Sequence, residues 1–112
     1  MGQSGGLTLC PSDVVAIRGA SVLMRAAAKP GRSLLRWRRK PYGNSTDETV
    51  IYTGIQLDYK QVDDRYFVAG SRDEERSLVI SDVKSTDAAQ FTVHDVSSHQ
   101  SASVNLVVVG KF

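Results

Sequence analysis

Residues 34–40 read Leu-Leu-Arg-Trp-Arg-Arg-Lys, and this stretch decides the fold. In it, apolar Leu35 and Trp37 alternate with Arg36 and Arg38. Successive side chains of a β-strand point to opposite faces, so the alternation predicts a strand that is buried on one face only. We therefore expect Trp37 to lie in the core between two layers, with the arginines on the opposite face.

Short stretches of the same kind recur along the chain, and turn-forming Gly, Pro, Asn, Asp and Ser residues separate them. No stretch predicts a stable helix, because the alanines at 26–28 are followed at once by Pro30. Eight or nine short strands favour an antiparallel β-sandwich. The strands are expected at residues 13–17, 21–26, 34–40, 49–53, 65–69, 77–83, 88–93 and 101–109.

The composition is that of one soluble globular domain. The chain has 112 residues, of which 41% are hydrophobic and 23% charged, so collagen-like and disordered classes are excluded. No apolar run approaches the ~20 residues that a membrane span requires. Residues 1–6 lack the apolar segment of a signal peptide, and we expect a flexible leader or tag there, followed by one domain over residues 7–110.

The sequence predicts neither a metal site nor catalysis. Cys10 is the only cysteine, which excludes an internal disulfide and a cysteine-based zinc cluster. His94 and His99 have no third ligand of their type nearby. No nucleophile elbow or phosphate-binding loop is present, so we expect no enzymatic activity, no metal and no cofactor.

Four features, in order along the chain, carry a resemblance to a known family. Residues 21–26 look like the second strand of an immunoglobulin domain, and Trp37 follows at the spacing of that family's core tryptophan. Residues 65–71 look like the Arg-Phe-Ser-Gly-Ser stretch of variable domains, and residues 87–93 have the form Asp-x-Ala-x-Tyr-x-Cys. The chain thus resembles an immunoglobulin-superfamily domain of variable type over residues 7–110. The resemblance implies a two-sheet antiparallel Greek-key sandwich of variable-type length, with an extra strand pair.

The chain also departs from the pattern of this family. Ala26 and Val93 occupy the positions of the intersheet disulfide, and Phe91 replaces the tyrosine of the corner motif. Residues 101–109 lack the Phe-Gly-x-Gly bulge of antigen-receptor domains and are closer to the intermediate set of adhesion and muscle proteins. We expect Ala26 and Val93 to fill the place of the disulfide by apolar contact around Trp37.

One ion pair is implied by the resemblance. Arg65 and Asp87 look like the pair that closes one end of variable-type sandwiches, and its expected role is structural. Arg39 stands where related domains direct an arginine toward the same corner, so it could share Asp87.

The basic run at residues 36–40 is the main candidate for a binding surface. On the outer face of a front sheet made of the third, fourth, sixth and seventh strands, it would contact an acidic protein, a glycan or nucleic acid. The alternative is a solvated face whose cations pair with Asp47 and Glu48. Nucleic acid is disfavoured, because no outward aromatic residues are interleaved with the cations. The candidate protein-binding residues are Arg36, Arg38, Lys40, Tyr52, Gln90, Thr92 and His94.

Two functions fit these expectations. The first is a non-enzymatic recognition or adhesion module at the cell surface, which binds another protein or a second copy of itself through the front sheet. Asn44 begins an Asn-Ser-Thr glycosylation triplet in a predicted loop and supports this function. The alternative is an intracellular scaffold domain of a giant muscle-type protein, which the absent disulfide supports. We prefer the extracellular module, and in neither case is the domain expected to insert into a membrane.

Overall fold

The computed structural model describes residues 8–10, 13–28, 34–43, 47–60, 62–72 and 75–110. Every strand that the alternation predicts is present, with ends that differ by a few residues. The predicted leader at residues 1–6 and the glycosylation triplet at Asn44 lie outside the described residues. The elements are β1 (Thr8–Cys10), β2 (Asp13–Ile17), β3 (Val22–Ala27), β4 (Leu35–Pro41), β5 (Thr49–Tyr52), β6 (Tyr66–Arg72), β7 (Glu75–Ile80), the 3-10 turn η1 (Ser85–Asp87), β8 (Ala89–Asp95) and β9 (Gln100–Val109).

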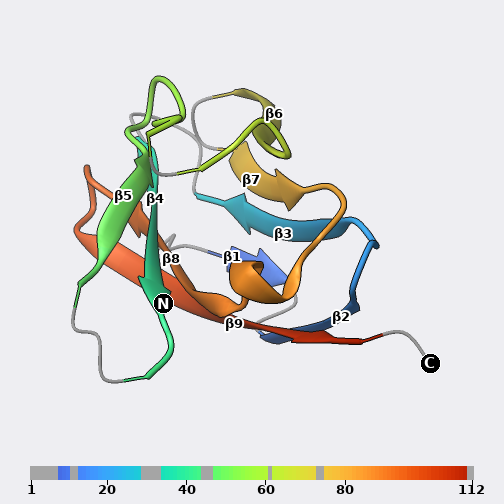
Figure 1. The fold of residues 1–112 in the computed structure, drawn as a ribbon. Coiled ribbons are helices and arrows are strands. Elements are labelled where there is room, and N and C mark those ends of the chain that lie inside the picture. Colours follow the sequence, from blue (N-terminus) through green and yellow to red (C-terminus); the bar gives the residue numbers. More distant parts are fainter. Residues whose placement is uncertain are drawn as a thin grey trace.

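The strands form two layers, as the sequence predicted for a β-sandwich (Figure 1). The back sheet has the order β1-β3-β7-β6, and the front sheet has the order β2-β9-β8-β4-β5. The chain crosses between the layers from β3 to β4 and from β7 to β8, so strands that are distant in sequence, such as β4 and β8, become neighbours. These crossovers place the basic strand β4 inside the front sheet, between β8 and the edge strand β5.

Two details differ from the predicted arrangement. The sheets are not antiparallel throughout, because β2 pairs with β9 in parallel, with Val15 opposite Val107. The chain changes sheet between β1 and β2 and therefore runs along β9 in the same direction. Of the expected extra strand pair, only β5 is a strand within the described part of the chain, and it is followed by a single bridge between Tyr52 and Leu57.

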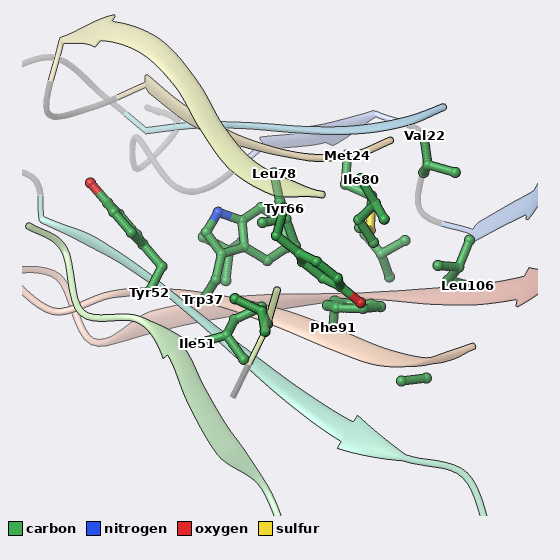
Figure 2. Packing of buried hydrophobic residues seen from close by; sticks show 14 of the residues in the cluster. Val22, Met24, Trp37, Ile51, Tyr52, Tyr66, Leu78, Ile80, Phe91 and Leu106 are labelled. Carbon is green, nitrogen blue, oxygen red and sulfur yellow. The ribbon is translucent and has the colours of Figure 1, made fainter. Parts of the chain in front are cut away.

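The core lies between the two sheets and contains the residues that the alternation placed there (Figure 2). Trp37 and Phe91 are the largest side chains that are fully buried. Burying an aromatic side chain of this size contributes about 3 kcal/mol of hydrophobic stabilisation. The other predicted core residues, all buried, are Val22, Met24, Leu35, Leu78 and Ile80.

Ala26 and Val93 are both buried, as their positions predict. Val93 on β8 is the registered neighbour of Trp37 on β4, so these two side chains share the inner face of the front sheet. Ala26 belongs to β3 of the back sheet. The positions of the absent disulfide are thus filled by a small and a medium-sized apolar side chain, and the buried Ser77 hydroxyl accepts from the Ala26 backbone N–H over 3.3 Å.

We predict that Ala26→Cys combined with Val93→Cys forms a disulfide spontaneously under mild oxidant. Cross-linking two strands so far apart in sequence reduces the entropy of the unfolded chain and stabilises the fold by up to roughly 4 kcal/mol, less any strain. Thiol titration and the shift of the urea midpoint on reduction measure the effect. The single Ala26→Cys variant is the control. A double variant that stays reduced while folded would contradict the prediction that residues 26 and 93 face each other across the core.

Candidate functional site

The outer face of the front sheet brings together most of the residues predicted to bind a partner. Along β4 and β8 the registered pairs are Arg36 with His94, Arg38 with Thr92, and Lys40 with Gln90. All of them are half-buried, as side chains in the middle of a sheet face are. We call this surface the basic face; it consists of Arg36, Arg38, Lys40, Gln90, Thr92 and His94.

Strand β9 continues the basic face with polar residues. The hydroxyls of Thr92 and Ser103 are 2.9 Å apart, and the Gln90 amide donates to Asn105 Oδ1 over 3.4 Å. Asn105 in turn donates through Nδ2 to Asp13 on β2, over 3.2 Å. A row of small hydrogen-bonding groups therefore runs across the sheet next to the cations.

The cations of the basic face are only partly neutralised. Arg38 Nη1 lies 3.4 Å from Glu48 Oε1, and the two side chains are 39% and 33% exposed. An ion pair this exposed contributes about 0–1 kcal/mol. Arg36 donates through Nε to the Thr53 carbonyl, and Lys40 has no ion pair with any described residue. The prediction of pairing with Glu48 therefore holds for one of the cations only.

Tyr52 does not belong to this face, contrary to the prediction. It is 6% exposed and lies in the core, where Figure 2 shows it beside Ile51 and Trp37. The pairing of β4 with β5 shifts register between Trp37 and Arg38, and Ile51 and Tyr52 are both buried although they are consecutive. The irregularity interrupts the alternation on which the prediction depended.

An apolar patch, which the sequence reasoning missed, adjoins the basic face. Val15 and Ile17 on β2 are 71% and 55% exposed, and their registered partners Val107 and Val109 on β9 are 45% and 37% exposed. We call these four residues the apolar patch. Val107 and Val109 follow Ser103 and Asn105 on the outer face of β9, and Val15 and Ile17 lie beside them on β2. The signal was available in the sequence, since residues 14–17 and 106–109 are apolar without interruption, so both faces of these strands carry apolar side chains.

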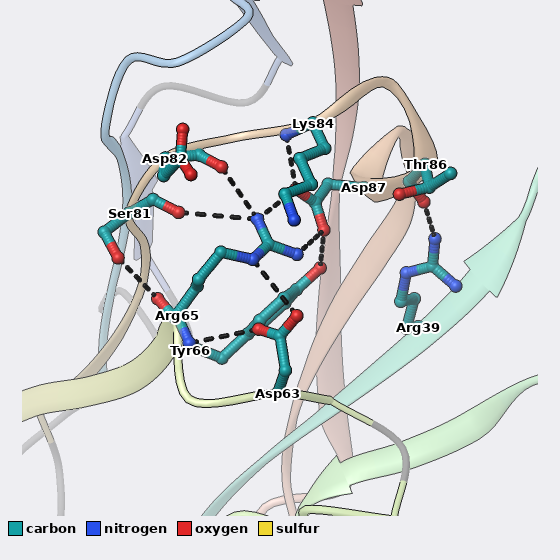
Figure 3. A network of polar contacts seen from close by, with 9 residues as sticks. All are labelled: Arg39, Asp63, Arg65, Tyr66, Ser81, Asp82, Lys84, Thr86 and Asp87. Atoms are coloured by element: carbon teal, nitrogen blue, oxygen red, sulfur yellow. Dashed lines mark hydrogen bonds and ion pairs between the residues drawn. The ribbon is translucent and has the colours of Figure 1, made fainter.

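A buried network of polar side chains lies at one end of the sandwich (Figure 3). Arg65, just before β6, contacts Asp87 with two hydrogen bonds of 2.7 and 3.0 Å, so the pair implied by the resemblance is present. The Tyr66 hydroxyl donates to Asp87 Oδ1 over 2.7 Å, and the Lys84 backbone N–H donates to Oδ2 over 2.7 Å. Arg65 also donates from Nε to Asp63. Each oxygen of the buried Asp87 is thus doubly hydrogen-bonded.

The contacts of Asp87 outweigh the effect of its burial. Burial alone would raise the pKa of this carboxyl, but the hydrogen bonds from Arg65, from the Lys84 N–H and from the Tyr66 hydroxyl hold it below its ordinary value of 3.8. Burial and the bond to Asp87 raise the pKa of Tyr66, which therefore remains a donor at neutral pH. Asp87 is ionised and fixed in place.

Arg39 reaches the same corner but has no hydrogen bond or ion pair with Asp87. Its Nη2 donates to the Thr86 carbonyl over 2.6 Å, and its guanidinium carbon lies 6.0 Å from the centre of the Phe91 ring. Where the resemblance suggested a shared carboxylate, the arginine stacks on the phenylalanine that replaces the corner tyrosine. The hydroxyl of Tyr66, from another strand, reaches Asp87 instead.

No arrangement for catalysis or metal binding emerges from the described side chains. Within those ranges, no group of three or more His, Cys, Asp or Glu residues comes close enough to hold a metal ion. The described residues also include no helix with the length and hydrophobicity of a membrane span. The surface features that remain are those of a sheet face and of the polar end of a sandwich.

Comparison with known proteins shows the fold. Neither a protein-family model nor a curated protein matches the chain. Among solved structures, a chain from the work on the structural basis of T cell specificity and activation by the bacterial superantigen toxic shock syndrome toxin-1 is similar, with a TM-score of 0.75. The similarity covers 95% of this chain and 100% of that chain, at 13% sequence identity. It supports a two-layer β-sandwich, in agreement with the sequence prediction.

We predict that Asp87→Asn lowers the free energy of unfolding by about 3 kcal/mol at neutral pH, because it leaves Arg65 without its buried partner. Since the folded-state pKa of Asp87 is depressed, its contribution is complete above the ordinary value of 3.8 and is lost as the pH falls through the lower, folded-state value. The variant should therefore lose less stability than the wild type on acidification.

Urea unfolding at a series of pH values measures both effects. Asp64→Asn is the matched control, because this neighbouring carboxylate is exposed and should change stability by no more than about 0.5 kcal/mol. If the stability curves of the wild type and Asp87→Asn run parallel below the ordinary carboxyl pKa, the folded protein does not lower the pKa of Asp87, and the prediction is wrong.

Proposed function

We propose that this chain is a non-enzymatic protein-recognition module of the immunoglobulin type, and that it binds another protein through the outer face of its front sheet. The proposal rests on one observation, that the basic face on β4 and β8 and the apolar patch on β9 and β2 belong to the same sheet. Exposed apolar side chains on neighbouring strands are typical of docking surfaces. Together the two regions give an apolar area with a charged and polar border, which is the usual composition of a protein interface.

The immunoglobulin assignment is supported by how the resembling residues are used. Trp37 is buried between the sheets, Ala26 and Val93 are buried beside it, and Arg65 pairs with Asp87. The last strand without a Phe-Gly-x-Gly bulge and the presence of β5 without a following strand in the described residues are compatible with a type between the variable and intermediate sets. In the family pattern these positions have structural roles. The outer face of the front sheet is therefore available for binding.

The charge of the basic face favours an acidic partner over a second copy of the chain. A symmetric pairing across β4 would bring Arg36, Arg38 and Lys40 of one copy against the same cations of the other. Of these three cations, Arg38 is the one that forms an ion pair within the described residues, with Glu48, and this pair would reduce the repulsion. An acidic partner would instead be attracted, and its association rate would fall as salt is added.

We expect a double charge reversal, Arg36→Glu with Lys40→Glu, to weaken binding to a protein partner by at least about tenfold, because two attractive contacts become repulsive. The wild-type domain, immobilised, would be screened against a panel of purified cell-surface ectodomains, and each hit would be titrated at low and high salt. Sedimentation equilibrium of the same proteins measures self-association. Arg25→Glu is the matched control, since Arg25 is exposed on β3 of the back sheet.

The proposal requires the front-sheet variant to lose affinity and salt dependence while the Arg25→Glu variant keeps both. Equal affinity of all three proteins for every hit would move the site away from this face. Strong self-association that survives the double reversal would contradict the argument against a symmetric pair. Circular dichroism and thermal melting of each variant exclude a loss of folding as the cause.

A further inference from the structure

A polar hollow of about 330 Å³ opens at the end of the sandwich, beside the Asp87 network. Its wall comes from β4, from η1 and from the segment that leads into β6. The volume lies at the lower end of the ~300–1,000 Å³ typical of small-molecule sites. The charged residues that line it are Arg39, Lys60, Asp63, Arg65 and Asp87.

The carboxylates of the hollow are already occupied. Asp87 accepts from Arg65, Tyr66 and the Lys84 N–H, and Asp63 accepts through Oδ1 from the Arg65 backbone N–H and through Oδ2 from Arg65 Nε. Every carboxylate oxygen in the hollow therefore has a donor. Asp63, Arg65 and Asp87 together carry a net charge of −1, so with Arg39 and Lys60 the charged residues of the wall sum to +1.

The two remaining cations of the hollow form no ion pair with an acidic residue in the part of the chain that the structure describes. Lys60 is exposed and forms no ion pair with the described residues. The single hydrogen bond of the Arg39 guanidinium to the described residues is that from Nη2 to Thr86, and its Nε is buried without any partner. Buried donors are normally satisfied, and an unsatisfied one at a hollow is a common sign of a missing ion or water.

Arg39 is nevertheless held rigidly. Figure 3 shows its guanidinium beside Thr86, across from the Arg65 side chain, and the ring of Phe91 lies 6.0 Å from the guanidinium carbon. A cation positioned in this way loses little rotamer freedom when a ligand binds, so its charge-assisted hydrogen bonds are available at low entropic cost. Arg39 is thus preorganised, and Lys60 is a mobile second charge at the same hollow.

From these contacts we propose that the hollow binds a phosphate or sulfate group, held between Arg39 and Lys60. The charged residues of the wall carry a net positive charge, and a tetrahedral oxyanion accepts from both a guanidinium and an ammonium. The polar wall and the volume leave room for a small polar body attached to that group. This site is separate from the front-sheet surface and does not depend on the function proposed for it.

The test is a titration of the wild-type domain with inorganic phosphate at neutral pH and constant ionic strength, followed by amide chemical shifts in nuclear magnetic resonance. We expect saturable shifts at Lys60, Thr86 and Asp87, with chloride producing none. A parallel titration with O-phosphoserine distinguishes the sources of the anion, since tighter binding than that of inorganic phosphate indicates a phosphate carried on a larger molecule.

Lys60→Gln and Arg39→Gln should each weaken phosphate binding by about tenfold, the loss expected when one charge-assisted contact is removed. Lys60→Gln is the safer variant for folding, because Lys60 is exposed. Lys84→Gln is the matched control; Lys84 is an exposed cation near the network that does not line the hollow, and its loss should change binding by less than about twofold. Shifts that do not saturate, or an equal loss in Lys84→Gln and Lys60→Gln, would overturn the proposal.

Discussion

Trp37 connects the two sheets of this sandwich, and the remaining structure is arranged around it. Its ring is fully buried, and its Nε1 donates to the carbonyl of Arg76 over 2.9 Å. Trp37 belongs to β4 of the front sheet and Arg76 to β7 of the back sheet, so this hydrogen bond crosses the core. In a domain whose Ala26 and Val93 cannot form the usual disulfide, apolar contact and this directed bond hold the layers together.

The Asp87 network is the second connection between the layers, at the end of the sandwich. Asp87 lies in η1, where the chain crosses from β7 to β8, and Arg65 and Tyr66 lie at the start of β6. Because the carboxylate is buried and each oxygen accepts two hydrogen bonds, the crossover is held in one conformation. The same contacts give every oxygen of Asp87 a donor, whereas Arg39 and Lys60 form no ion pair within the described residues. A structural network thereby shapes the charge of the hollow beside it.

The division between the interior and the surface follows from the alternation within each strand. On β4, β8 and β9, the inward positions build the core, and the outward positions build one continuous face with cations, small polar groups and exposed valines. The front sheet has β2 and β5 at its edges, so the apolar patch on β2 and β9 lies along one edge and the basic strand β4 lies inside the other. Rigid strands therefore fix the relative positions of the two regions that we propose contact a partner.

The amino-acid sequence by itself determined the local structure and the separation of faces. Period-two alternation is a property of neighbouring residues, and it was sufficient to predict the strands, the burial of Trp37 and the six polar residues of the basic face. The pairing of Arg65 with Asp87 came from the resemblance, which carries information about distant contacts that alternation lacks.

Only the tertiary structure decided the features that depend on how strands meet. The register shift between β4 and β5 buries Tyr52, and the parallel pairing of β2 with β9 joins two apolar stretches into a patch. Arg39, with its bond to Thr86 and its contact with Phe91, could not be assigned from neighbours in sequence either. The physical reason is the same in each case: these contacts join residues from strands far apart in the chain, and the geometry of the pairing selects which side chains meet.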